Sequence, residues 1–156
     1  MELSHITYLN IIKNVDLTPP ESVTIPPQIK PALVTLASRH ATLPFLLPYI
    51  NDPQYLPLLK QQAKRMLLNY CQIEQFTRRI VSIFEKEQIP YFLLKGISLC
   101  DCYPIPEYRK LGDVDLYIND PPAFEKAKKL LKQNGFVLQD ELSDHHLTYS
   151  YTFPVI

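Results

Sequence analysis

The sequence predicts an α+β fold in which a helical N-terminal region, residues 1–88, precedes a core of strands and helices, residues 89–156. Two observations predict this division. Between residues 53 and 87 apolar side chains recur every three or four positions, which is the spacing of one face of an amphipathic helix. From Ile89 onward they come in short runs rich in aromatic and branched residues, which are typical of buried strands.

The N-terminal region is predicted to contain helices of very different lengths. Residues 1–28 are polar and interrupted by Pro-Pro pairs, so we expect a short helix and then an extended arm. Residues 29–50 favour short helices that prolines break. The long helix over 53–87 has as its apolar positions Leu58, Leu59, Ala63, Met66, Leu67, Tyr70, Ile73, Phe76, Ile80, Ile83 and Phe84.

The C-terminal core is predicted to alternate strands with helices. Strands are expected over 89–94, 114–118, 136–138 and 146–155, and helices over 96–103 and 123–134. Asp120 is a suitable N-cap for the second helix, because its side chain can accept from the first free backbone N–H groups. Gly135 follows that helix at the position where glycine commonly ends one.

The charge and cysteine content narrow the function classes. Lys plus Arg and Asp plus Glu number 16 each, which argues against general binding to nucleic acid or to an anionic membrane. A local basic patch stays open, because neutrality is a sum over the chain. No run approaches the roughly 18 apolar residues of a membrane span. An odd number of cysteines, 3, and the lack of a signal-like N-terminal segment predict a cytoplasmic protein with free thiols.

Asp113 and Asp115 are the candidate metal ligands. They lie two positions apart in a predicted strand, so their carboxylates project from one face, about 7 Å apart along the chain. Carboxylates arranged in this way can converge on divalent cations, and two such cations suit phosphoryl or nucleotidyl transfer. Taken alone, an Asp-x-Asp pair is more often a pair of solvated loop carboxylates.

Lys95 and Gly96 are candidates for binding phosphate. Gly96 lies between a predicted strand and a predicted helix, where backbone N–H groups favour an anion and a missing Cβ allows close approach. Ser98 could add a hydroxyl donor, and Lys95 and Arg109 could pair with phosphate oxygens. The simpler alternative is a glycine at a helix start beside a lysine at a strand end.

Together these residues resemble a known family. The order Leu-Leu-Lys95-Gly96-Ile-Ser98, then Tyr103-Pro-x-Pro, then Arg109-x-x-Gly112-Asp113-Val-Asp115-Leu is similar to the uncharacterised bacterial nucleotidyltransferase family of the DNA polymerase β-like superfamily. The helical region containing Ala37-Ser-Arg39-His40 is similar as well. The resemblance extends from about residue 30 onward.

The resemblance implies a fold, a cofactor and a substrate. The fold is a polymerase-β-like core with a mixed β-sheet flanked by helices. The implied cofactor is Mg²⁺, as two ions held by Asp113 and Asp115, and the donor substrate is an NTP such as ATP. Gly96 and Ser98 then belong to the phosphate-binding turn. The acceptor, whether small molecule, peptide or protein, is left open.

The sequence departs from the superfamily pattern at two places. Ile97 separates Gly96 from Ser98, where the usual turn has the glycine followed directly by Gly or Ser. A third carboxylate is expected just after a His-His segment and an apolar strand. His145 and His146 are present, but the chain stops at Ile156. We therefore expect the core to be truncated at its C-terminus. His145 and His146 point to opposite faces of a strand, so at most one of them can face the site, and a structural or solvated role is favoured for each.

Three functions are compatible with the sequence. The leading hypothesis is a Mg²⁺-dependent nucleotidyltransferase that uses Asp113 and Asp115. The alternative is a catalytically inactive nucleotide- or partner-binding module with the same fold. A third hypothesis gives the N-terminal helices a docking role, which an exposed apolar stripe on the long helix would favour.

Overall fold

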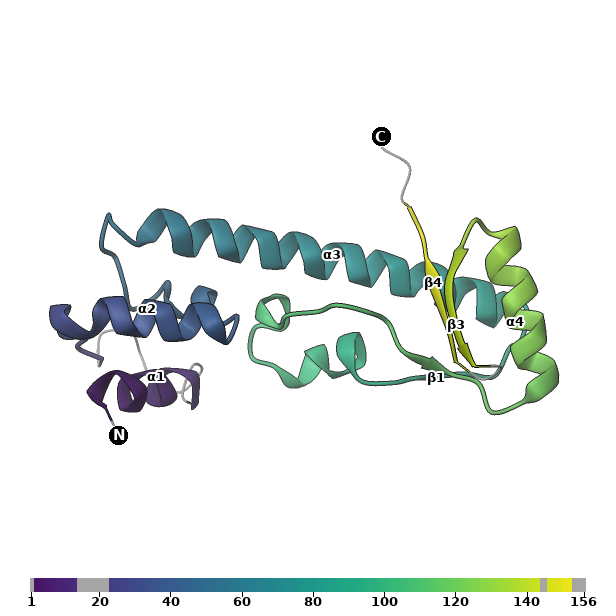
Figure 1. Cartoon of the computed structure of the whole chain (residues 1–156), viewed down its shortest axis with the longest axis horizontal. Coiled ribbons are helices and arrows are strands. Elements are labelled where there is room, and N and C mark those ends of the chain that lie inside the picture. The colour runs from purple at the N-terminus through teal and green to yellow at the C-terminus, as the bar shows by residue number, and fades with distance from the viewer. Residues whose placement is uncertain (1, 14–22, 144–145, 153–156) are drawn as a thin grey trace. The chain divides into compact units, whose positions relative to one another are not determined.

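The computed structural model describes residues 2–13, 23–143 and 146–152 (Figure 1). Its α-helices are α1 (Leu3–Lys13), α2 (Lys30–Arg39), α3 (Leu56–Lys86) and α4 (Pro121–Gln133). Its 3₁₀ helices are η2 (Pro27–Ile29), η3 (Leu43–Leu46), η4 (Gly96–Cys102) and η5 (Pro106–Tyr108). The strands are β1 (Phe92–Leu93), β2 (Leu116–Tyr117), β3 (Val137–Ser143) and β4 (His146–Ser150).

The chain folds into two compact units. Unit 1 comprises residues 1–71 with 99–111, and unit 2 comprises 72–98 with 112–156. The division falls inside α3, so the first part of this helix belongs to unit 1 and the second part to unit 2. The predicted domain boundary near residue 88 stays a prediction, because compactness alone does not test which segment folds independently.

Unit 1 is held together by an apolar cluster from its helices. Ile11 of α1, Leu33 of α2 and Leu59 of α3 are at most 1% exposed and share one core. Figure 1 shows α1 beside α2, and the two helices are in contact. The hydroxyl groups of Tyr8 and Thr42 lie 2.8 Å apart and add a polar link between α1 and the segment after α2.

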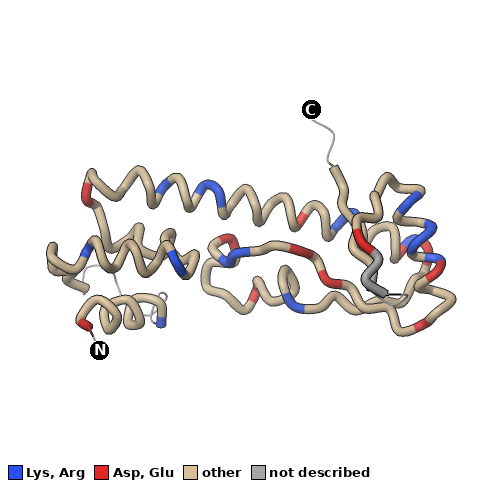
Figure 2. The backbone as a smooth tube through the Cα atoms, viewed as in Figure 1, with Lys and Arg blue, Asp and Glu red and all other residues tan. Residues whose placement is uncertain are grey.

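Unit 2 has its own core, in which α4 packs on the end of α3. Ala123, Ala127 and Leu131 follow one another at four-residue spacing and are all buried, as are Ile80 and Phe84 of α3. Lysines occupy other positions of α4, which Figure 2 shows as blue segments along that helix. The predicted N-cap is confirmed, because the backbone N–H of Ala123 donates to Oδ2 of Asp120 at 2.8 Å.

The sheets of the described residues are smaller than expected. β1 pairs with β2 and β3 pairs with β4, both antiparallel, and each sheet has two strands. The predicted α+β class holds, but the mixed sheet is not seen among these residues. Only two residues separate β3 from β4, and a connection that short allows antiparallel pairing alone. β3 also continues through Asp140 and Glu141, beyond the predicted strand over 136–138.

Several helices end in the same backbone motif. After α3, the N–H of Ile89 donates to the carbonyl of Phe84 and that of Gln88 donates to the carbonyl of Glu85. This pair of bonds defines a Schellman motif, which requires a positive φ at the residue after the cap. Gln88 has φ +54° there. The same pair of bonds follows α2, with Ala41 at φ +55°, and follows α4, with Gly135 at φ +84°.

These motifs give a prediction about stability. Gln88→Gly and Ala41→Gly are each expected to raise the free energy of unfolding by about 0.5–1 kcal/mol, because glycine adopts positive φ without a Cβ clash. Gly135→Ala is expected to lower it by a similar amount. A Cβ at that position would lie 3.7 Å from Cε2 of Tyr151, an ordinary contact, so backbone strain is the main cost. Urea unfolding followed by circular dichroism measures each change, and destabilisation by Gln88→Gly would contradict the assignment.

Candidate active site

The ladder between β1 and β2 brings the two predicted motifs together. Phe92 pairs with Tyr117 and Leu93 with Leu116, and the backbone N–H of Leu94 extends the ladder by donating to the carbonyl of Asp115 at 2.9 Å. In an antiparallel pair, each step forward along one strand is matched by a step back along its partner, so the residue numbers of opposite residues have a constant sum. The register therefore places Gly96 opposite Asp113, as the structure confirms: a Cβ built on Gly96 would lie 3.3 Å from the carbonyl oxygen of Asp113.

The two aspartates lie just before β2 and not inside it. The strand comprises only Leu116 and Tyr117, so the predicted strand over 114–118 is shortened at both ends. Its partner β1 is equally short, which limits how far regular pairing extends. Asp113 is exposed and Asp115 is half-buried. Asp113 is therefore open to solvent and ligands, while Asp115 is partly enclosed.

Lys95 forms an ion pair with one of these carboxylates. Its Nζ lies 3.2 Å from Oδ2 of Asp115. That oxygen is shielded from solvent and has no hydrogen bond of good geometry to any described residue, so the contact is an attraction between charges. The Lys95 side chain is 69% exposed, and exposed ion pairs contribute little to stability. The pair therefore leaves Lys95 able to exchange Asp115 for another anion at small cost.

Gly96 and Ser98 form the turn that follows β1. Gly96 has φ +64°, a left-handed conformation that glycine adopts without strain, and it begins η4. The helix expected over 96–103 is a 3₁₀ helix of 7 residues. The Ser98 hydroxyl donates to the carbonyl of Lys95 at 3.1 Å, closing the turn on itself. The structure therefore places Lys95, Gly96, Asp113 and Asp115 in one short region of unit 2.

A cavity of about 790 Å³ opens beside the two carboxylates, and all of its lining residues belong to unit 2. Lys95, Gly96 and Ser98 do not line it. The wall is made by segments far apart in sequence: Gln72, Ile73 and Phe76 of α3, residues 112–116, Phe124 of α4, and residues 147–152. The hollow therefore joins the carboxylates to aromatic and hydroxyl side chains that are remote from the motif.

The sequence interpretation missed that β4 and the residues after it line the cavity. Residues 147–152 alternate, with Thr148, Ser150 and Thr152 exposed while Leu147, Tyr149 and Tyr151 are half-buried. Tyr149 and Tyr151 pack against the core of unit 2. The alternation of hydroxyl and apolar residues with a period of two is visible in the sequence and predicts a strand with one polar face. It does not show that this strand borders the aspartates.

Arg109 belongs to unit 1 and has its own surroundings there. Its guanidinium carbon lies 5.4 Å from the centre of the Tyr103 ring. Its Nε is shielded from solvent without a hydrogen-bond partner among the described residues. Burial raises the pKa of the neighbouring Cys100 thiol, and the Arg109 guanidinium partly opposes that rise. The predicted contact of Arg109 with phosphate stays a prediction.

The remaining predicted features are accounted for as follows. His145 lies outside the described residues, and His146 begins β4 without a described side chain. Among the side chains that the structure describes, no group of three or more His, Cys, Asp or Glu is placed to share a metal ion. Cys71, Cys100 and Cys102 are free thiols, as expected. None of the described helices combines the length and apolar character needed to cross a membrane.

Comparison with known families agrees with the motif. Residues 28–154 match the sequence model of an uncharacterised nucleotidyltransferase family. The chain belongs to this family. Family membership implies an NTP substrate. Neither the curated proteins nor the solved structures contain a match to the chain.

The two glycines of the motif differ in a way that can be tested. Gly96→Ala is expected to lower the free energy of unfolding by about 1 kcal/mol or more, because the new Cβ combines positive φ with a 3.3 Å approach to the Asp113 carbonyl. Gly112→Ala is the matched control, since a Cβ there meets no atom within 4 Å. Chemical denaturation of both variants measures the difference. Equal destabilisation would show that the β1–β2 register does not depend on Gly96.

Proposed function

We propose that this chain is a Mg²⁺-dependent nucleotidyltransferase of the DNA polymerase β-like superfamily, which moves a nucleotidyl group from an NTP to an acceptor. One observation carries the proposal: Asp113 and Asp115 form part of the wall of a cavity of about 790 Å³ in a nucleotidyltransferase family member. The proposal has two parts: the type of reaction, and the role of Asp113 and Asp115 as its catalytic carboxylates.

The size and lining of the cavity support an NTP as its occupant. Ligand sites commonly enclose roughly 300–1,000 Å³, and this cavity lies within that range. Phe76 and Tyr149 supply aromatic surface that suits a nucleobase, and base–aromatic stacking depends little on base identity. Thr148 and Ser150 supply hydroxyl groups for polar parts of the ligand. The wall therefore matches a molecule with a flat apolar end and a polar end.

The two carboxylates fit Mg²⁺ that arrives with a nucleotide. Asp113 is exposed, and Asp115 has a shielded oxygen that makes no hydrogen bond to any described residue, so both offer hard oxygen ligands. Mg²⁺ is commonly held by one or two carboxylates together with substrate phosphates and waters. When bound, it would neutralise phosphate charge and lower the pKa of an attacking hydroxyl. We assign Asp113 and Asp115 as its protein ligands, for two ions.

Lys95 and the turn that it starts would manage the charge of the phosphates. The ammonium group of Lys95 balances Asp115, 3.2 Å away. A cation bound by Asp115 would displace Lys95, which is exposed enough to swing towards a phosphate oxygen. Gly96 would let phosphate approach the backbone, and Ser98 would add its hydroxyl. Each of these roles is part of the proposal.

One observation favours the second candidate function, a nucleotide- or partner-binding module without turnover. The described residues hold no third carboxylate grouped with Asp113 and Asp115. Among the described side chains, no further carboxylate is therefore placed with this pair to activate the acceptor, while the proposed ligands of Mg-NTP are present. Binding without transfer would follow from such a site.

Calorimetry with ATP tests the assignment of the carboxylates. In the unmodified chain, ATP is expected to bind about tenfold more tightly with Mg²⁺ than without it, because the cation links phosphate to Asp113 and Asp115. Asp113→Asn combined with Asp115→Asn is expected to abolish this dependence on Mg²⁺. An unchanged response of the double variant would reject the assigned site.

Two controls accompany this measurement. Glu125→Gln removes a carboxylate of the same unit that pairs with Lys128 at 3.0 Å and does not line the cavity, so it should leave the Mg²⁺ dependence intact. Release of pyrophosphate from ATP then separates the two candidate functions. Release supports the transferase, because pyrophosphate leaves only as the AMP group passes to an acceptor, to a side chain of the protein or to water. Mg²⁺-dependent binding without release is the result expected of the binding module.

A further inference from the structure

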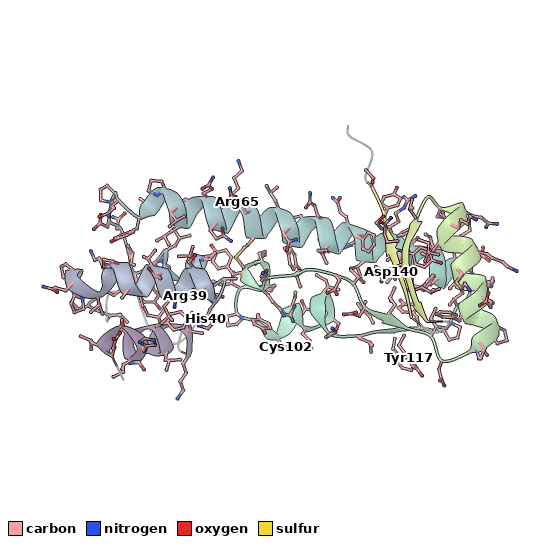
Figure 3. All side chains as sticks on the ribbon, viewed as in Figure 1. Arg39, His40, Arg65, Cys102, Tyr117 and Asp140 are labelled. Atoms are coloured by element: carbon pink, nitrogen blue, oxygen red, sulfur yellow. The ribbon has the colours of Figure 1, made fainter. Side chains whose placement is uncertain are left out.

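A second hollow lies entirely within unit 1 and is unrelated to the carboxylates. We call it the α2–α3 pocket; it encloses about 400 Å³. Its rim includes Ser38 at the end of α2, Gln62, Arg65 and Asn69 on α3, and Lys110. Figure 3 labels Arg65 on α3, and labels Arg39 and His40 at the end of α2.

The base of the α2–α3 pocket is apolar. Leu43, Met66 and Leu111 line it, and each is at most 5% exposed. Ala41 also lines it, at the left-handed position of the Schellman motif that turns the chain from α2 towards η3. Packed side chains and a defined helix end therefore form the apolar part of the lining.

The rim of the pocket is cationic and lacks acidic side chains. Arg65 and Lys110 both line it, and neither makes an ion pair or hydrogen bond with any described residue. Among the described lining residues there is no Asp or Glu. Figure 2 shows the basic residues of this part of α3 in blue. Exposed cations are common on protein surfaces, but here two of them border one concave site with no carboxylate to balance them.

Side-chain amides complete the polar lining. Gln62, Arg65 and Asn69 are spaced three and four residues apart, which places them on one face of α3. Gln62 and Asn69 are half-buried and have no hydrogen-bond partner in the part of the chain that the structure describes. Each amide can donate two hydrogen bonds. Charged and neutral donors therefore border the same space.

We propose that the α2–α3 pocket binds the phosphate group of a small phosphorylated molecule. A phosphomonoester carries about −1.5 to −2 charge near pH 7, which matches two cations, whereas a carboxylate would leave one of them unbalanced. The planar Arg65 guanidinium suits two phosphate oxygens at once. The volume exceeds what a bare phosphate fills, and the apolar base suits the organic part of the ligand. This site is separate from the proposed NTP site and does not depend on it.

Titration of the full chain with phenyl phosphate, followed by amide chemical shifts, tests the proposal. Saturable shifts are expected in residues 38–43, 62–69 and 110–111, and benzoate is expected to bind about tenfold more weakly, because it carries one charge fewer. Absence of saturation at millimolar phenyl phosphate, or shifts confined to unit 2, would overturn the site. Equal affinity for benzoate would overturn the assignment of phosphate.

Matched variants separate this site from general attraction to basic surface. Arg65→Gln and Lys110→Gln are each expected to weaken phenyl phosphate binding about tenfold, the loss typical of one charge-assisted hydrogen bond. Lys64→Gln removes the same charge from the neighbouring position of α3, which is exposed and does not line the pocket, and should leave affinity unchanged. A loss with Lys64→Gln equal to that with Arg65→Gln would overturn the proposal. Circular dichroism confirms that each variant is folded.

Discussion

The pairing of β1 with β2 is the constraint on which the candidate site depends. The bond from the N–H of Leu94 to the carbonyl of Asp115 sets the register, and the register sets Gly96 against Asp113. A slip of one residue would turn each side chain of a strand to the opposite face. Glycine at position 96 permits both the positive φ and the close approach that this register requires. The side chains that meet at the site are therefore aligned by backbone geometry.

The two-stranded sheet of β1 and β2 is too short to be stable by itself, so it relies on the apolar core of unit 2. Isolated two-stranded ribbons are marginal in water, and these strands are two residues long. Leu116 and Tyr91 pack against the same cluster that contains Phe84 and Leu131. Because α4 and β4 also pack on that cluster, residues 147–152 come to line the cavity with Asp113 and Asp115. Stability and the shape of the candidate site thus have a common source.

The two proposed sites differ in how charge is balanced. The carboxylate of Asp115 and the ammonium group of Lys95 balance one another, so a bound cation must displace Lys95. Because Lys95 is exposed, this displacement costs little free energy. In the α2–α3 pocket, Arg65 and Lys110 have no carboxylate beside them in the described lining. An anionic ligand there would gain attraction without displacing a partner. The first arrangement suits Mg-NTP, and the second suits phosphate without a metal.

The sequence by itself determined the local features and the family. Three- and four-residue spacing predicts α3, and the side chain of Asp120 and the freedom of Gly135 mark the ends of α4. The order of Lys95-Gly96 and Asp113-Val-Asp115 indicates the nucleotidyltransferase family. Each of these signals can be read along the chain, without knowing which distant segments are in contact. Tertiary structure decided the lengths and partners of the strands, the ion pair of Lys95, the part of β4 in the cavity and the α2–α3 pocket. These features depend on which distant segments pack together. The energy of such a contact depends on both segments at once, so neither segment's sequence predicts it alone.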